Sequence, residues 1–156
     1  MTHDDESDAL AGLSADQVIE RMGLEHLEGE GVWIRVIGRS DAGSAIYALL
    51  TPTDFSALHL LQEDELWVHV AGSPIDMTQL RADGSVVDVR LGRALGESLH
   101  AIVPAGTWQG STTAGEWTLV VCSLAPPFSG FVLADSTTDL SSWALAPIRR
   151  KELIRG

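Results

Sequence analysis

The stretch EDELWVHVAGSPIDMTQLRADGSVVDVRLG (63–92) gives the strongest indication of fold class in the sequence. Apolar and polar residues alternate in it over short runs, and turn-forming residues such as Asp83-Gly84 separate the runs. A period of two is typical of β-strands, and Asp-Gly between two strands predicts a hairpin. The strands expected within this stretch are 65–71, 75–80 and 86–92.

The same pattern continues on both sides of this stretch. Many short strands separated by turns are typical of an all-β sandwich or barrel. The predicted fold class is therefore all-β. The further strands expected are 32–38, 44–50, 56–61, 100–104, 116–124 and 130–134.

Short helices are expected at both ends of the barrel. Ser14 and Gln17 have the spacing of a capping box, apolar residues follow at helical spacing, and Gly23 is a stop signal. The last segment returns to a helix-like pattern, with Pro147 near the start of a helix. The expected organisation is a disordered acidic tail (1–8), a barrel with its N-terminal helix (9–135) and a C-terminal helical extension (136–156).

Composition excludes several classes of function. The chain has 156 residues, with 22 Asp and Glu against 10 Lys and Arg, a formal net charge of -12. Nucleic acids and anionic membrane surfaces require a positive footprint, so neither is an expected partner. The single cysteine excludes an internal disulfide framework. The N-terminus is acidic rather than signal-like, and a cytoplasmic protein is expected.

One strand face carries chemically active side chains. Glu65, Trp67 and His69 share a face of the expected strand 65–71, and the opposite face is apolar. A carboxylate, an indole and an imidazole are unusual in a core and natural in a pocket wall. His59 lies on the preceding expected strand, so it converges with Glu65 if the two strands are neighbours.

Four other residues are candidates for the same pocket. Trp108 and Gln109 follow a Pro-x-Gly turn, Tyr47 is the only tyrosine, and Arg35 lies in an early strand. Each also has a purely structural interpretation, since Tyr47 can be a core ring and Glu65 can simply pair with an arginine. Cys122 is expected to be a small buried residue.

The order and spacing of several segments resemble the cupins. The resemblance is closest to the small single-domain RmlC-like cupins, a family of unknown function, and it extends over nearly the whole chain. It implies a double-stranded β-helix, the jelly-roll cupin barrel, and a homodimer. The segments that carry it are 26–35, 44–50, 54–59, 63–77, 80–92, 103–109 and 118–135.

The resemblance also bears on metal binding. The positions that hold the ion in metal-binding cupins correspond here to His59, Leu61, Glu65 and Gln109, so two usual ligands are replaced. One imidazole, one carboxylate and one amide make a poor transition-metal site. No cofactor is expected. A weak divalent metal at His59, Glu65 and Gln109, with His69 as a fourth ligand, stays open.

The resemblance implies an enzyme that acts on a small molecule by acid–base chemistry, as metal-free sugar-nucleotide epimerases do. In such a metal-independent isomerase, epimerase or lyase, His59 is the expected general base and Glu65 orients it, because imidazoles titrate near neutral pH. Tyr47 or His69 is the expected acid.

Residues for substrate binding follow from the same hypothesis. Trp67 and Trp108 are expected to sandwich a ring, while Gln109 and Arg35 supply hydrogen bonds. One alternative is non-catalytic binding of a ring-containing metabolite. A second alternative is a metal-dependent oxygenase or isomerase, against which Leu61 and Gln109 argue.

Overall fold

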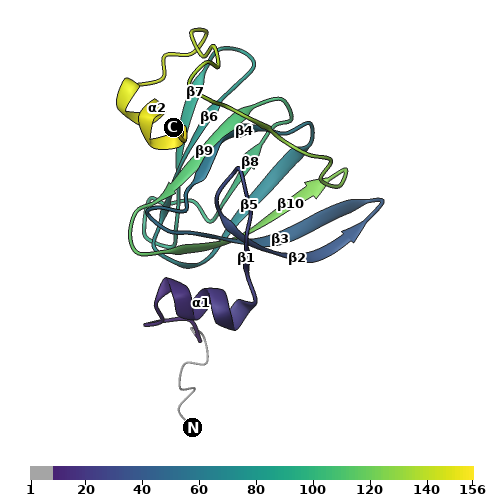
Figure 1. Ribbon diagram of the computed structural model, residues 1–156, viewed down its shortest axis with the longest axis vertical. Helices are drawn as coiled ribbons and strands as arrows, with labels where there is room; N and C mark the ends of the chain where they lie inside the picture. Colours follow the sequence, from purple (N-terminus) through teal and green to yellow (C-terminus); the bar gives the residue numbers. More distant parts are fainter. Residues whose placement is uncertain (1–8) are drawn as a thin grey trace.

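Two antiparallel sheets form a barrel within residues 9–156, which are the residues that the computed structural model describes (Figure 1). The first sheet has the order β1 (Glu25–His26), β2 (Trp33–Ser40), β3 (Gly43–Leu50), β10 (Thr118–Ala125), β5 (Asp64–Gly72), β8 (His100–Val103). The second has the order β11 (Val132–Leu133), β4 (Ser56–Leu60), β9 (Trp108–Thr113), β6 (Ile75–Leu80), β7 (Val86–Leu91). The predicted all-β class with flanking helices is confirmed. The expected tail, residues 1–8, lies outside the described residues.

Helix α1 (Ala15–Met22) begins at the predicted capping box. Ser14 Oγ accepts a hydrogen bond from the Gln17 amide, and Gln17 Oε1 accepts one from the Ser14 amide. Gly23 ends the helix in the left-handed conformation, with φ of 63°. The apolar face of α1 packs on the outer side of the first sheet, against Leu49 and Leu119.

Helix α2 (Pro147–Leu153) occupies only part of the expected C-terminal extension. Residues 136–146 form turns and irregular segments, and Pro147 stands at the first turn of the helix. Leu153 is fully buried against the outer side of the second sheet. A Cβ added to Gly110 of β9 would lie 3.0 Å from a Leu153 methyl group, so glycine lets the helix approach the strand. Figure 1 shows α1 and α2 on different sides of the barrel.

Strand β9 is the main element that the sequence pattern did not predict. Its sequence, WQGSTT, has few apolar residues and no alternation. It nevertheless pairs with β4 on one side and β6 on the other, so its backbone groups are satisfied by two ladders.

The main core lies between the two sheets. Cys122 belongs to it, as the sequence predicted, and burial raises the pKa of its thiol well above the usual range. No helix within residues 9–156 has both the length and the apolar character that are needed to span a bilayer. The buried core members are Val32, Ala48, Leu50, Trp67, Ile75, Met77, Leu91, Ala101, Val103, Val120 and Cys122.

Candidate active site

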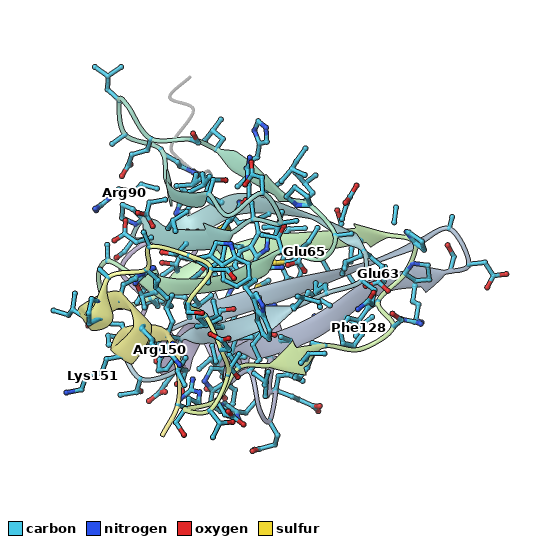
Figure 2. The ribbon with its side chains drawn as sticks, turned by 90° about the horizontal axis from the view of Figure 1, so that it is seen from above. Glu63, Glu65, Arg90, Phe128, Arg150 and Lys151 are labelled. Carbon is cyan, nitrogen blue, oxygen red and sulfur yellow. The ribbon has the colours of Figure 1, made fainter. Side chains whose placement is uncertain are left out.

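A cavity of about 190 Å³ lies inside the barrel and receives side chains from both sheets. Its wall is mostly apolar, and a few polar groups converge in it, as in many small-molecule sites. Figure 2 labels Glu65 among the strands and Phe128 on the segment that follows β10. The apolar lining is Leu27, Ile34, Val36, Ile46, Leu61, Leu124 and Phe128; the polar lining is Glu30, Arg39, Ser44, His59 and Glu65.

His59 projects into this cavity from β4 and is 2% exposed. Its Nδ1 lies 2.7 Å from the carbonyl oxygen of Ala57. A carbonyl only accepts hydrogen bonds, so Nδ1 carries the hydrogen. In the neutral ring, Nε2 therefore has a free lone pair, and this atom is 3.9 Å from Oε1 of Glu30.

Glu65 lies opposite His59, on β5 of the other sheet. The pKa of its carboxyl is raised from 4.5 to about 7, mainly by burial and also by the nearby Glu30 carboxylate. The charge of His59 and the hydrogen bond from Trp67 lower it. At neutral pH the carboxyl is therefore present in both protonation states, which an acid–base catalyst requires.

Glu30 completes the group of ionisable side chains and was not among the residues expected from the sequence. Oε1 of Glu30 accepts a hydrogen bond of 2.6 Å from Oγ of the fully buried Ser56. Arg155 fixes the main chain at Glu30 through hydrogen bonds. Its guanidinium donates to the carbonyl oxygens of Glu30 and Phe55, the latter at 2.9 Å, and stacks 4.0 Å above the Phe55 ring. Arg155 thus anchors the part of the cavity wall that contains Glu30.

Trp67 supports the cavity from inside the core rather than lining it. Its Nε1–H lies 2.6 Å from Oε1 of Glu65 and 3.1 Å from Oε1 of Gln109, so it donates to both. The indole is 2% exposed and no face of it is free for a ligand. Trp67 is therefore a positioning residue for Glu65, and Gln109 accepts from the same indole N–H.

Replacing Trp67 by phenylalanine is expected to lower the free energy of unfolding by roughly 1–3 kcal/mol, because two buried oxygens lose their donor. Urea denaturation at pH 7 measures the loss. Trp33→Phe is the matched control, since Trp33 Nε1 also donates to a carboxylate, Asp54, at 3.0 Å but in a half-exposed place. A smaller loss is expected there. Equal losses in the two variants would contradict a special role of the Trp67 bridge.

The convergence of His59 and Glu65 arises differently from the expected way. From the sequence, the two side chains were expected to converge if their strands were neighbours. The structure places β4 in the second sheet and β5 in the first, so the two side chains face each other across the barrel interior.

The structure does not bring the other selected residues into the cavity. Tyr47 packs on the outer face with α1, and Arg35 donates to the carbonyl oxygen of Met22 near the end of that helix. Trp108 packs on the outer side of the second sheet, close to α2, so it cannot sandwich a ligand with Trp67. Successive side chains of a strand point to opposite faces, and the neighbours of each of these three residues face inward, so all three face outward.

His69 shares the inward face of β5 but lies away from the cavity. Its Nε2 is 3.0 Å from the carbonyl oxygen of Ser73, so Nε2 carries the hydrogen. Within the described residues, its Nδ1 has no hydrogen-bond partner. The site thus loses the two acids that the sequence suggested, Tyr47 and His69.

Arg39 lines the cavity where the sequence suggested Arg35. The two arginines are four residues apart, so a regular strand would place them on the same face. The pairing of β2 with β3 shifts between Val36 and Gly38, which inserts an extra residue and reverses the alternation. Arg39 therefore faces inward, opposite Ser44.

The residues at the usual metal positions of cupins do not fit a transition metal. Oε1 of Glu65 and Oε1 of Gln109 already accept from Trp67, and Leu61 offers no donor atom. Only His59 contributes a nitrogen. Within residues 9–156 no group of three His, Cys, Asp or Glu side chains is arranged to hold a metal ion.

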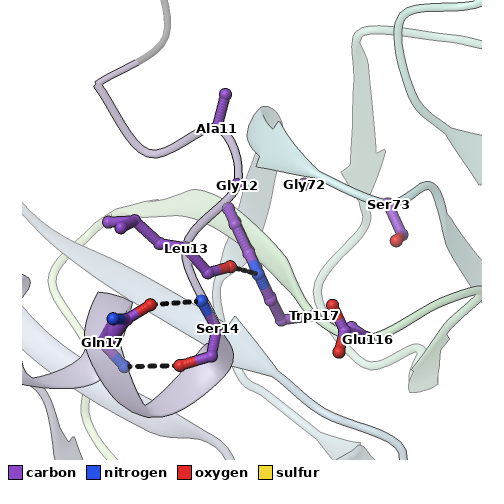
Figure 3. Close-up of a pocket in the computed structure, with 9 residues that line it drawn as sticks. All are labelled: Ala11, Gly12, Leu13, Ser14, Gln17, Gly72, Ser73, Glu116 and Trp117. Atoms are coloured by element: carbon purple, nitrogen blue, oxygen red, sulfur yellow. Dashed lines mark hydrogen bonds between the residues drawn. The ribbon is translucent and has the colours of Figure 1, made fainter.

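A wider depression lies elsewhere, between the start of α1 and the turns after β5 and before β10 (Figure 3). Its polar groups are used structurally. Ser14 and Gln17 form the capping box, and Trp117 Nε1 donates to the carbonyl oxygen of Leu13. Among residues 9–156, Glu116 is the only ionisable residue that lines it, which is too few for the chemistry considered above.

Solved structures support the fold over almost the whole chain. Protein SO0799 from Shewanella oneidensis superposes with a TM-score of 0.81 at 28% identity, over 92% of this chain and 98% of its own. A hypothetical protein from Leishmania major gives 0.78 at 25% identity, over 90% and 97%. KdgF from Halomonas sp. gives 0.53 at 13% identity, over 66% and 84%, which indicates the fold alone.

No curated protein matches the chain. The family model described as Cupin superfamily (DUF985) matches residues 16–136, which include every polar residue of the cavity. This agrees with the resemblance seen in the sequence. The chain therefore belongs to the DUF985 family of the cupin superfamily.

Proposed function

We propose that this cupin is an enzyme that isomerises, epimerises or eliminates from a small organic molecule by proton transfer in the barrel cavity, without a metal ion. The observation that carries the proposal is the orientation of His59. Its Nδ1–H is engaged by the Ala57 carbonyl, so the lone pair on Nε2 is available beside Glu30 and Glu65. A buried imidazole held in one tautomer is suited to act as a general base.

In the proposed step, Nε2 of His59 removes a proton from a carbon next to a carbonyl group. The electron pair of that C–H bond forms a C=C bond, and the carbonyl oxygen takes the proton of the Glu65 carboxyl to give an enol. The carboxylate of Glu30, 3.9 Å from Nε2, stabilises the imidazolium. Return of a proton to the other face or to the neighbouring carbon completes epimerisation or isomerisation; expulsion of a leaving group completes elimination.

This scheme assigns the acid to Glu65 instead of Tyr47 or His69. A carboxyl with a pKa of about 7 gives up a proton and takes it back at neutral pH. Proton transfer of this kind requires no metal, in keeping with the donor set described above.

Non-catalytic binding is the alternative, and the mostly apolar lining favours it. The cavity volume of about 190 Å³ lies below the roughly 300–1,000 Å³ of sites that hold drug-sized ligands. This favours a compact ligand over a large ring system, and the tryptophans do not flank the cavity.

Hydrogen–deuterium exchange tests the proposal without knowledge of the natural substrate. The protein is incubated in D₂O with 2-oxobutanoate, 3-methyl-2-oxobutanoate or hydroxyacetone, and ¹H NMR follows loss of the C–H signal next to the carbonyl. We expect exchange above the buffer rate for at least one compound. A compound that binds to the cavity but exchanges at the buffer rate would instead support passive binding, and no exchange with any of the three would contradict the proposal.

A further inference from the structure

Arg39 stands at the mouth of the cavity. It is exposed, whereas His59 inside the cavity is 2% exposed. Its Nη1 donates a hydrogen bond of 2.9 Å to the carbonyl oxygen of Phe128, another lining residue. A guanidinium has five N–H groups in a planar fork, so most of its donors remain for a ligand.

The charge of Arg39 is available to an anionic ligand because no carboxylate of the described residues pairs with it, although the cavity as a whole has more acidic than basic side chains. Arg39 is the only basic residue among the arginines and lysines of residues 9–156 that lines the cavity, while Glu30 and Glu65 are its acidic residues. Within the same residues, no carboxylate lies within ion-pair distance of Arg39, although the chain has 22 acidic residues against 10 basic ones.

We propose that Arg39 binds the carboxylate of the substrate, and that the substrate class is small 2-oxo or related carboxylic acids with an apolar body. The carboxylate pairs with the guanidinium at the mouth, and the apolar body contacts Leu61 and Leu124. The reacting C–H bond then faces His59. This inference rests on the proposed function, because it takes the cavity as the place where the substrate reacts.

A purely structural role for Arg39 must be separated from binding. The main chain of Phe128 is held from both sides, since its carbonyl accepts from Arg39 and its amide donates to Oγ of Ser44 at 2.9 Å. Ser44→Ala breaks the second contact and leaves the guanidinium in place. It therefore perturbs the Phe128 segment without removing the positive charge.

The test compares two probes of nearly equal shape, 3-methyl-2-oxobutanoate and 3-methyl-2-oxobutanamide. Isothermal titration calorimetry gives the Kd of each for the wild-type chain, Arg39→Gln, Ser44→Ala and Arg35→Gln. The last variant removes one positive charge from the same strand on its outer face. We expect the wild type to bind the carboxylate at least tenfold more tightly than the amide, a preference that weakens with added salt.

Arg39→Gln is expected to bring the two Kd values within about twofold of each other, while Arg35→Gln keeps the tenfold preference. Because Ser44 also lines the cavity, Ser44→Ala is expected to change both Kd values alike, so that their ratio stays near tenfold. The inference is overturned if the wild type shows no preference for the carboxylate, if Arg39→Gln keeps it, or if Ser44→Ala abolishes it equally.

The same variants separate this inference from the proposed function. If the carboxylate preference depends on Arg39 but no compound exchanges deuterium, the proposed function fails and the binding site stands. If hydroxyacetone exchanges and the carboxylate preference is absent, the proposed function stands and the role of Arg39 fails.

Discussion

Replacing His59 by glutamine is expected to lower the rate of deuterium exchange at least ~100-fold, in the range typical for loss of a general base. Glutamine retains hydrogen-bonding capacity at this place but has no basic nitrogen. The fold should remain, because β4, which carries both Ala57 and His59, pairs with β9 on one edge and with β11 on the other. ¹H NMR of the exchanging compound gives the rate, and circular dichroism checks the fold.

Two comparisons make this result specific. His100→Gln changes an exposed histidine on β8, and its rate should equal that of the wild type. His69→Gln separates the two candidate acids, since His69 contacts Ser73 rather than the cavity. A loss in His69→Gln as large as that in His59→Gln would return the acid to His69 and contradict the assignment to Glu65.

Replacing Glu65 by glutamine is expected to change the free energy of unfolding more favourably at pH 8 than at pH 4.5. The difference between the two effects is expected to reach about 3 kcal/mol, the equivalent of a pKa moved from 4.5 to about 7. The folded chain holds the Glu65 proton in this range and the unfolded chain releases it. The contribution of the protonated carboxyl is therefore fully present below pH 4.5 and is lost as the pH rises through about 7. Glutamine does not ionise, so the stability of the variant does not fall for this reason as the pH rises.

Urea denaturation of both proteins at pH 4.5 and pH 8 measures this effect as a difference of differences, which cancels any pH-independent cost of the substitution. Glu25→Gln, at an exposed site on β1, is the matched control and should show no such pH dependence. If the stabilities of the wild type and E65Q change in parallel between these pH values, the pKa of Glu65 is not raised by folding.

Much of the fold follows from local pattern. The capping box of α1, the Asp83-Gly84 hairpin and the alternation in β5 are encoded within a few residues, and each appears in the structure where it was predicted. Strand β9 was missed because pairing on both edges, rather than apolar alternation, stabilises it. Tertiary contacts of this kind leave little trace in a single sequence.

The candidate site was predictable only in part. His59 and Glu65 were selected because ionisable residues on an inward strand face are unusual. Arg39 was missed because the irregularity between Val36 and Gly38 reverses the face of the strand residues that follow it. The residue types at this place do not predict a bulge. Glu30 was missed because it lies in a loop, where the sequence has no periodicity from which the direction of a side chain can be predicted.

The most direct test of this account is a ¹³C NMR titration of the Glu65 carboxyl in protein labelled at the glutamate side-chain carboxyl carbon, with Glu65→Gln to assign the signal. We predict a midpoint near pH 7, which moves upward in His59→Gln because the charge of His59 lowers the pKa of this carboxyl. A midpoint near 4.5 that His59→Gln leaves unchanged would contradict the account, since no proton would then be available beside His59 at neutral pH.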